Sequence, residues 1–430
     1  MLPISDIVMP HPIVVTVICD GHRPDFVSDE TTPHMARLRR AGTWFADHRG
    51  IFPSATRASS ASIATGSWPR SHGLRGNTVA LPVAGGHEVH DAGKPKFYDA
   101  YRGHFGRLLA RRSLAERVAP LNGAVLCSNV SPGAAFFHDS YGHGTLLHRE
   151  LSYTPGRLPL KETIDAPPGS IGDVLLADRF LAVLASNPPS IATLWLSEPD
   201  KTMHAFPLGS PEHLLALRAV DDHVGAVAQA VERLRDKGHD VLLLMGSDHG
   251  HEAVTEVIPV ERRLFEAGFK TSLESPEIVV APQGSSAFIH FGRSSLSRRA
   301  EVASWLGEQP WAGRVISGED LAELGQIPGD DLLAVDMAKS AGSNRNGVPG
   351  LTAMAVRFSE QEDAIRRDCG MHGGLGAYET QPTLIAVGRG FEAGASITRT
   401  SRIIDMAPTA LAHLDLPLEE VDGTALQKWP

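Results

Sequence analysis

Acidic residues and histidines follow several apolar runs of this sequence, in short turns that are rich in glycine. Carboxylate oxygens and imidazole nitrogens are the protein groups that bind zinc and related divalent cations. One such residue alone is more often a helix cap or a surface group, but their recurrence in separate turns favours a common metal centre. The residues are Asp20, Asp200, His204, Asp248, His249 and His372.

The spacing within two of these turns supports a shared centre. Asp200 and His204 in "SEPDKTMH" are four residues apart, so a helix there would place both on one face. Asp248 and His249 are adjacent in "GSDHGHE", on a turn flanked by glycines. Three carboxylates and three imidazoles suit two cations better than one. Two cations about 4 Å apart can hold the attacking and leaving oxygens of an in-line displacement at phosphorus.

The stretch "IFPSATRASSASIATG" (residues 51–66) offers several hydroxyl groups among small residues. Runs rich in serine and alanine are usually linkers. A hydroxyl beside a metal centre becomes a nucleophile, however, because the metal stabilises its alkoxide form. Since the rest of the chain supplies partners for such a centre, we interpret this stretch as part of a catalytic site.

Alternating strands and helices are needed to bring these turns together, and the sequence predicts them. The run "IVVTVI" (13–18) is continuously apolar, as in a strand that is buried on both faces. Helices are predicted over 33–42 and 210–238, each ended by a glycine. The pattern predicts an α/β fold with a doubly wound, mostly parallel sheet and helices on both faces. Ligands bind beyond the carboxyl ends of the strands in such sheets.

Two parts of the chain interrupt this alternation. Residues 79–110 and 129–165 are rich in Gly, Pro and His, and they are predicted to form long loops over one end of the sheet. Residues 270–350 are predicted to form a small α/β cap insertion. The predicted catalytic core comprises residues 1–265 and 365–430, with loop insertions at about 79–165.

Composition is that of a soluble globular protein, with 42% hydrophobic and 21% charged residues. A net charge of -10 argues against binding to nucleic-acid polymers. No apolar run is long enough for a membrane span, and the N-terminal residues lack a signal-peptide pattern. Cys19, Cys127 and Cys369 fit neither a disulfide framework nor a paired metal spacing. We therefore expect a cytoplasmic protein, with a homodimer as one possible state.

The motifs "CDG", "FPSAT", "SHG", "EPD…H", "SDHG" and "MHGG", in this order, resemble those of the alkaline phosphatase superfamily. Within it, the chain is similar to the type I phosphodiesterase/nucleotide pyrophosphatase branch, to which phosphonoacetate hydrolase is related. The resemblance covers roughly residues 12–78, 165–260 and 365–428. It implies an alkaline-phosphatase-like fold and hydrolysis of small-molecule phosphoric esters with two zinc ions, or with manganese or another divalent metal.

The resemblance also implies roles for individual residues. The diesterase branch has a threonine nucleophile in a pattern like P-T-K-T, and "PSAT" places Thr56 there, where it would form a covalent phospho-enzyme. An asparagine shortly after the branch's "SHG" donates to the phosphoryl group, and Asn77 matches it. One metal would be held by Asp200, His204 and His372, and the other by Asp20, Asp248, His249 and Thr56.

Residues beside the motifs are given structural roles. Thr56 is expected at the start of a helix over about 57–65. Four nearby serines are expected to cap or pack this helix, namely Ser54, Ser59, Ser60 and Ser62. His22, His72 and His251 are expected either to donate to the metal ligands or to lie in turns.

Departures from the relatives leave alternatives to a phosphodiesterase. A sulfatase of this superfamily needs a C/S-x-P-x-R motif, and the absence of this motif here argues against that activity. Phosphonoacetate hydrolases carry lysines where this chain has "CSNVSPGAAF", which disfavours hydrolysis of a C–P bond but leaves it open. Arg57 is a candidate for substrate binding, and a cation from Arg57, Arg75 or Lys201 facing the site would favour a phosphomonoesterase. A metal- or phosphate-binding pseudoenzyme is the non-enzymatic alternative, although Thr56 and the metal-ligand candidates are all retained.

Overall fold

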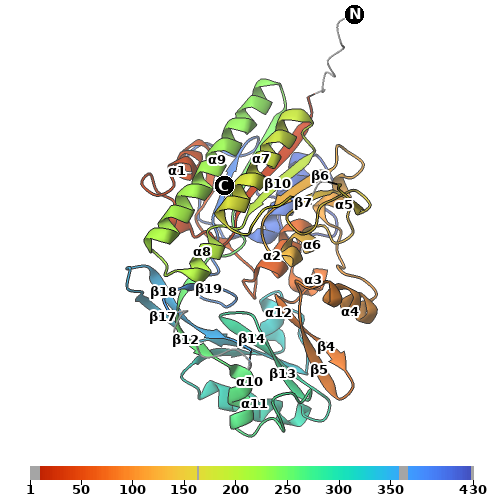
Figure 1. Ribbon diagram of the computed structural model, residues 1–430, viewed down its shortest axis with the longest axis vertical. Coiled ribbons are helices and arrows are strands. Elements are labelled where there is room, and N and C mark those ends of the chain that lie inside the picture. The colour runs from red at the N-terminus through yellow and green to blue at the C-terminus, as the bar shows by residue number, and fades with distance from the viewer. Residues whose placement is uncertain (1–9, 162–163, 358–366, 428–430) are drawn as a thin grey trace, which may run out of the picture.

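The computed structural model describes residues 10–161, 164–357 and 367–427. A ten-stranded sheet forms its centre, and the apolar strands in the middle run parallel to one another (Figure 1). In the order in which they pair, the strands are β21 (Ser396–Ile397), β2 (Thr43–Phe45), β20 (Leu384–Val387), β11 (Asp240–Gly246), β1 (Pro12–Cys19), β10 (Ile191–Leu196), β6 (Ala124–Ser128), β7 (Thr145–His148), β8 (Tyr153–Thr154) and β9 (Leu158–Pro159).

Helices cover both faces of this sheet, which explains why its central strands are apolar throughout. Side chains of β1 alternate between the faces: Val14 and Ile18 pack on one side, and Val15 and Val17 pack on the other. Two long helices lie side by side over the second face (Figure 1). They are α7 (Ser170–Ser186) and α9 (Pro211–Asp236), whereas α2 (Thr56–Thr65) and α13 (Met406–His413) contribute to the first core.

The prediction of a doubly wound α/β fold is confirmed, and the helices predicted over 33–42 and 210–238 are present. They are α1 (Pro33–Ala41) and α9. The sheet is mostly parallel, but β20 pairs antiparallel with β11 and β2, and β8 pairs antiparallel with β7 and β9. Among the described residues, no helix combines the length and the apolar character that crossing a membrane requires.

The prediction of long loops over 79–110 and 129–165 is wrong. The first segment contains a hairpin of β4 (Thr78–Val83) and β5 (Gly86–Asp91), followed by α4 (Pro95–Phe105). The second contains α6 (Pro132–His138) and the edge strands β7 to β9. The prediction failed because glycines and prolines at the turns of these short elements weaken the hydrophobic periodicity. One signal for the hairpin was Gly85, whose φ of 85° suits a tight turn between strands.

Below the central sheet in Figure 1 lies a cap built on an antiparallel sheet. We call it the cap sheet; its strands pair in the order β13 (Ile278–Pro282), β14 (Ser286–Phe291), β16 (Leu332–Met337) and β15 (Ala312–Ile316). A further sheet, β17 (Lys339–Ser343), β18 (Pro349–Ala355), β12 (Glu252–Ile258) and β19 (Gly370–Met371), lies between the cap sheet and the core. The exact boundaries between core and cap stay a prediction.

The remaining elements are short and connect or edge these layers. They are α3 (Pro69–His72), α5 (Leu114–Val118), α8 (Asp200–Ala205), α10 (Val260–Glu266), α11 (Arg299–Gly307), α12 (Glu319–Glu323), β3 (His48–Arg49) and β22 (Ser401–Arg402).

Candidate metal centre

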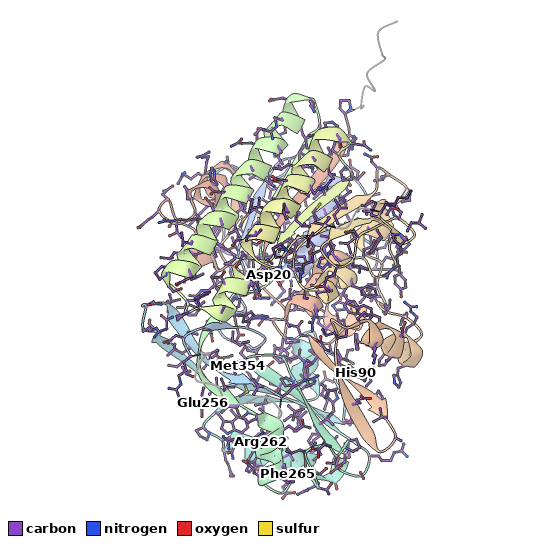
Figure 2. The ribbon with its side chains drawn as sticks, in the orientation of Figure 1. Asp20, His90, Glu256, Arg262, Phe265 and Met354 are labelled. Atoms are coloured by element: carbon purple, nitrogen blue, oxygen red, sulfur yellow. The ribbon has the colours of Figure 1, made fainter. Side chains whose placement is uncertain are left out.

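The carboxyl ends of β1, β10 and β11 meet at one edge of the central sheet, which we call the rim. Asp20 directly follows β1, and Asp248 follows β11. Asp200 begins α8 after β10, and its backbone N–H donates to the carbonyl of Asp20 at 3.1 Å. Figure 2 places Asp20 where the core meets the cap. Parallel strands therefore bring three acidic residues from distant parts of the chain to one place.

One group of donor atoms surrounds His249. Its Nε2 atom lies 3.4 Å from Oδ1 of Asp20, 3.2 Å from Oδ2 of Asp248 and 3.1 Å from the hydroxyl oxygen of Thr56. All four residues are buried. The structure thus brings together the whole set that the motifs assigned to one metal.

A second group surrounds Asp200. Its Oδ1 atom lies 3.2 Å from Nε2 of His204 and 3.6 Å from Nε2 of His372. The pair on α8 shares one helix face, as the spacing of four predicted. The rings of His249 and His372 stack with centroids 3.6 Å apart, so the two groups form one continuous centre.

Three of these histidines are oriented in the same way. The Nδ1–H group of each donates to a backbone carbonyl, which directs the lone pair of Nε2 into the centre. Metal-binding histidines are typically fixed by such a hydrogen bond. His204 donates to Gly370 (2.9 Å), His249 to Gly250 (3.1 Å) and His372 to Ser54 (2.6 Å).

The electrostatics of the centre fit divalent cations. Burial lowers the pKa of His249 to about 4 and that of His372 to about 3, so both imidazoles are neutral at physiological pH. Burial and repulsion between carboxylates raise the pKa of Asp20, and raise that of Asp248 to about 7. Oδ1 of Asp20 and Oδ2 of Asp248 are buried and accept no hydrogen bond. A divalent cation would stabilise both carboxylates in their ionised form.

Thr56 is the first residue of α2, at the end of the helix where unpaired N–H groups favour an anion. Nearly every residue of this helix is buried, and small side chains let it pack closely against α6. The serines take structural positions: Ser60 donates to the carbonyl of Ala134, and the hydroxyl of Ser54 accepts from the N–H of Gly373. The hydroxyl of Thr56 is therefore the one from this stretch that faces His249.

Asn77 and Arg57 lie next to Thr56 but are differently placed. Oδ1 of Asn77 accepts from the backbone N–H of Arg57 at 3.0 Å, so its NH₂ group remains to donate elsewhere. The Arg57 guanidinium forms a 2.6 Å ion pair with Asp91 of β5 and donates to the carbonyl of Asn77. Its charge is therefore already balanced. Contact of either residue with a substrate stays a prediction.

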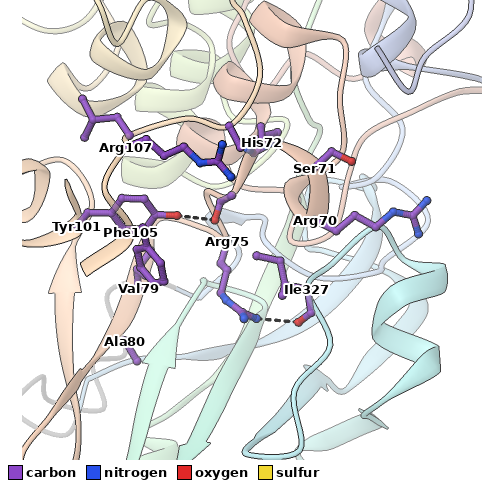
Figure 3. Close-up of a pocket in the computed structure, with 13 residues that line it drawn as sticks. Arg70, Ser71, His72, Arg75, Val79, Ala80, Tyr101, Phe105, Arg107 and Ile327 are labelled. Atoms are coloured by element: carbon purple, nitrogen blue, oxygen red, sulfur yellow. Dashed lines mark hydrogen bonds between the residues drawn. The ribbon is translucent and has the colours of Figure 1, made fainter. Parts of the chain in front are cut away.

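Arg75 is turned away from the rim. Its guanidinium donates to the carbonyl of Ile327 at 2.8 Å and lines a cavity of about 300 Å³ beside α3 and α4 (Figure 3). Arg70 and Arg107 line the same cavity, and Thr56 does not. Arg75 is therefore not the cation that a monoesterase site at the rim would need.

His251 is a fourth histidine at the centre, and the sequence leaves its role open between a donor to the metal ligands and a residue of the turn. Its Nε2 atom lies 2.9 Å from Oδ1 of Asp200. Room for it depends on two glycines, because a Cβ atom at Gly21 or Gly370 would lie 2.6 Å from its ring. The only signal was its position two residues after His249 in the same turn.

The loop that carries His372 is held by a buried carboxylate that no motif marks. Glu379 accepts from the N–H groups of Gly374 and Gly376 at 2.8 and 2.9 Å. It also forms a 2.6 Å ion pair with Lys339 of β17. The loop with His372 is thus held by Glu379, which is itself paired with Lys339 of the β17–β18–β12–β19 sheet.

The family model described as type I phosphodiesterase / nucleotide pyrophosphatase matches residues 14–309. The chain belongs to this family. The resemblance drawn from the motifs is thereby confirmed, and with it the place of the chain in the alkaline phosphatase superfamily.

Individual relatives are distant. The chain is 26% identical over 239 residues to human ectonucleotide pyrophosphatase/phosphodiesterase family member 1, across 54% of this chain and 23% of that protein. It is 24% identical over 243 residues to a bis(5'-adenosyl)-triphosphatase of Pongo abelii, across 56% and 47%. The chain thus spans less than half the length of these relatives.

A solved structure extends the likeness over the whole fold. Murine ectonucleotide pyrophosphatase/phosphodiesterase 5, in an inactive threonine-to-alanine variant bound to AMP, superposes with a TM-score of 0.68. The match has 18% identity and covers 96% of this chain and 98% of the other. This agreement supports the same fold.

Proposed function

We propose that the protein is a metal-dependent hydrolase of phosphoric diesters, with Thr56 as its nucleophile. The observation that carries the proposal is the position of the Thr56 hydroxyl. It lies at the N-terminus of α2, 3.1 Å from Nε2 of His249, beside two buried carboxylates that each have one oxygen without a hydrogen bond. A reactive hydroxyl, an anion-binding helix end and a cation site coincide there.

Two zinc ions would occupy this centre, with manganese as the alternative metal. One ion would be held by Asp200, His204 and His372, with His251 beside it. The other ion would be held by Asp20, Asp248, His249 and Thr56. When bound, the metals supply the charge that lowers the pKa of the Thr56 hydroxyl and stabilises negative charge on the phosphoryl oxygens.

The residues of the chain then divide the reaction into two steps. Oγ1 of Thr56 attacks phosphorus as the bond to the leaving oxygen breaks, which yields a phosphothreonine. The NH₂ group of Asn77 donates to a phosphoryl oxygen, and the N-terminus of α2 stabilises its charge. Water then attacks the same phosphorus as the bond to Oγ1 of Thr56 breaks, and a proton from the water restores the hydroxyl, so two inversions give net retention of configuration.

A singly charged diester fits this site better than a dianionic monoester. Arg57 is balanced by Asp91, and Arg75 faces another cavity, so neither is free to neutralise a second phosphate charge. Family membership and the nucleotides in the names of the relatives favour a nucleotide diester or pyrophosphate as substrate. The location in the cytoplasm and a homodimeric state stay predictions.

The test compares Thr56→Ala with Thr56→Ser on an aryl phosphodiester and a dinucleoside polyphosphate, at saturating zinc and manganese. We expect Thr56→Ala to lose nearly all turnover while the Thr56→Ser variant keeps a substantial part. Ser59→Ala is the matched control, because this serine lies one turn further into the same helix and its hydroxyl forms no hydrogen bond. A substrate with chiral phosphorus should be hydrolysed with retention.

Several results would overturn the proposal. Inversion at phosphorus, or near-normal turnover in Thr56→Ala, would place the nucleophile elsewhere. A strong preference for phosphate monoesters or for C–P bonds in the same panel would replace the diesterase with one of the alternatives. Metal binding without any hydrolysis across the panel would indicate a pseudoenzyme.

A further inference from the structure

A second group of metal-type ligands lies away from the rim, where the β4–β5 hairpin meets the cap sheet. We call this place the junction. It consists of His87 on β5, His290 on β14 and Asp331 just before β16. Donor atoms of the three residues lie within 4.8 Å of one another, and Nε2 of His87 is 3.4 Å from Oδ2 of Asp331. One ion could reach all three, since zinc binds nitrogen and oxygen at about 2.0–2.2 Å.

Backbone pairing fixes these residues on both sides of the junction. The N–H of His87 donates to the carbonyl of Pro276 at 3.0 Å, which joins the hairpin to the chain that enters β13. On the cap sheet, His290 pairs with Leu332, the residue after Asp331. The approach is close, because a Cβ atom at Gly86 would lie 1.8 Å from the carbonyl of Pro276. The backbone positions of the three residues are therefore set before any ion binds.

The burial of the junction residues suits a cation. His290 is buried, and the side chain of Asp331 is about half exposed, so an ion held between them could still reach water. Nδ1 of His87 is buried without a hydrogen-bond partner. A bound ligand would offset the cost of leaving this buried polar atom without a partner.

We propose that the junction binds one zinc-class divalent cation through His87, His290 and Asp331. Two imidazoles and one carboxylate favour zinc, cobalt or nickel over magnesium and calcium, which prefer oxygen ligands alone. The ion links the β4–β5 hairpin to the cap sheet and leaves a coordination position for water. The positive charge of Arg75 acts against any cation there, so the three ligands must offset this repulsion.

This ion is separate from those proposed for the rim, and it serves the fold rather than the reaction. The hairpin begins directly after Asn77, whose N–H donates to Oε1 of Gln283 at the end of β13. Zinc at the junction would fix the far side of the same hairpin. We therefore expect that loss of the junction ion lowers the melting temperature of the protein and changes the turnover number little.

The test counts zinc ions bound by the full chain, after metal removal and titration against a chromophoric chelator. Asp331→Asn and His87→Gln should each bind one zinc fewer than the wild type. The matched controls are Asp330→Asn, next to Asp331, and His90→Gln, on the same strand as His87; both should bind as the wild type does. Equal zinc counts in all five proteins would overturn the proposal.

A second measurement does not depend on whether the junction variants fold. The double variant Asp200→Ala/Asp248→Ala removes a ligand from each proposed rim site, and it should still bind one zinc ion and gain thermal stability from it. Magnesium should give no such gain. If zinc neither binds to this variant nor raises its melting temperature, the junction holds no metal. This outcome is distinct from a failure of the proposed function at the rim, because the roles of Thr56 and the rim ligands are tested by rates of hydrolysis.

Discussion

The rim and the junction gather the same residue types by different routes. At the rim, Asp20, Asp200 and Asp248 each follow one of three neighbouring parallel strands. The topology of the sheet therefore brings turns from distant parts of the chain to one edge. At the junction, His87 and His290 lie within strands of two different antiparallel layers. Sites at strand ends leave compact motifs in the sequence. Sites between layers do not, because their members look like ordinary alternating strand residues.

The largest effect that separates the two regions should come from Asp248→Ala. Its carboxylate is completely buried beside His249, so its loss removes a proposed ligand and negative charge from the rim. We expect diester turnover to fall about a hundred- to a thousandfold, the scale of losing one preorganised electrostatic group. Metal analysis of the same sample should show zinc loss from the rim while the junction ion stays.

Glu256→Ala, at an exposed position on β12, serves as the control for this experiment. His204→Ala, which removes a proposed ligand of the other rim metal, should also lower both zinc content and diester turnover. A variant that keeps its full metal content, or a wild type that stays fully active in chelator, would contradict a metal mechanism at the rim.

A smaller loss at the rim is expected from His251→Gln. Nε2 of His251 contacts Oδ1 of Asp200, and the ring is enclosed by Gly21 and Gly370. Removing a group that orients a metal ligand typically costs about 10- to 100-fold in affinity or activity. Zinc affinity and turnover should therefore fall together. His223→Gln on α9, away from the rim, is the control; a fall in turnover with unchanged zinc affinity would assign His251 to substrate instead.

The parts of the site that could be predicted from the sequence are those with local spacing. Asp200 and His204 could be placed on one helix face, and Thr56 at the start of a helix, because both depend on residues within one turn. The ion pair of Arg57 with Asp91 could not, since Asp91 belongs to a hairpin that resembles a glycine-rich loop. The contact of Glu379 with Lys339 depends on how two layers pack, and periodicity carries no information about that.

The balance between Arg57 and Asp91 gives a prediction of a few-fold size. Arg57→Ala should change diester turnover by less than about tenfold, because the guanidinium is already paired. Asp91→Asn leaves the guanidinium without its partner carboxylate and should raise the rate on phosphate monoesters relative to diesters. Rates on matched aryl mono- and diesters decide the matter. A monoesterase preference in the wild type that disappears in Arg57→Ala would instead make Arg57 a phosphate clamp.

The last difference concerns His72, a buried histidine that belongs to neither metal group, and it is expected in stability. Its Nδ1 accepts from the N–H of Leu74 at 3.2 Å, so the ring proton lies on Nε2 and is donated to the hydroxyl of Ser62 at 3.0 Å. Both nitrogens of His72 have a partner without a metal, whereas Nδ1 of His87 has none.

Stability should reveal this difference through pH. Burial lowers the pKa of His72 to about 3, whereas an unfolded histidine titrates near 6.5. Between these values the unfolded chain takes up a proton that the folded chain does not, so the contribution of His72 to stability is present above pH 6.5 and falls as the pH falls. At pH 5 the loss is about 2 kcal/mol. His72→Gln should therefore be more destabilising at pH 7 than at pH 5.

Urea unfolding of the metal-free protein at the two pH values measures this difference without a contribution from zinc release. His104→Gln, at an exposed position on α4, controls for the substitution itself. The free-energy difference between wild type and His72→Gln should shrink by up to about 2 kcal/mol from pH 7 to pH 5. If that difference does not change with pH, the folded protein accommodates the charged ring. The neutral form that Leu74 and Ser62 specify would then not be the one that matters for stability.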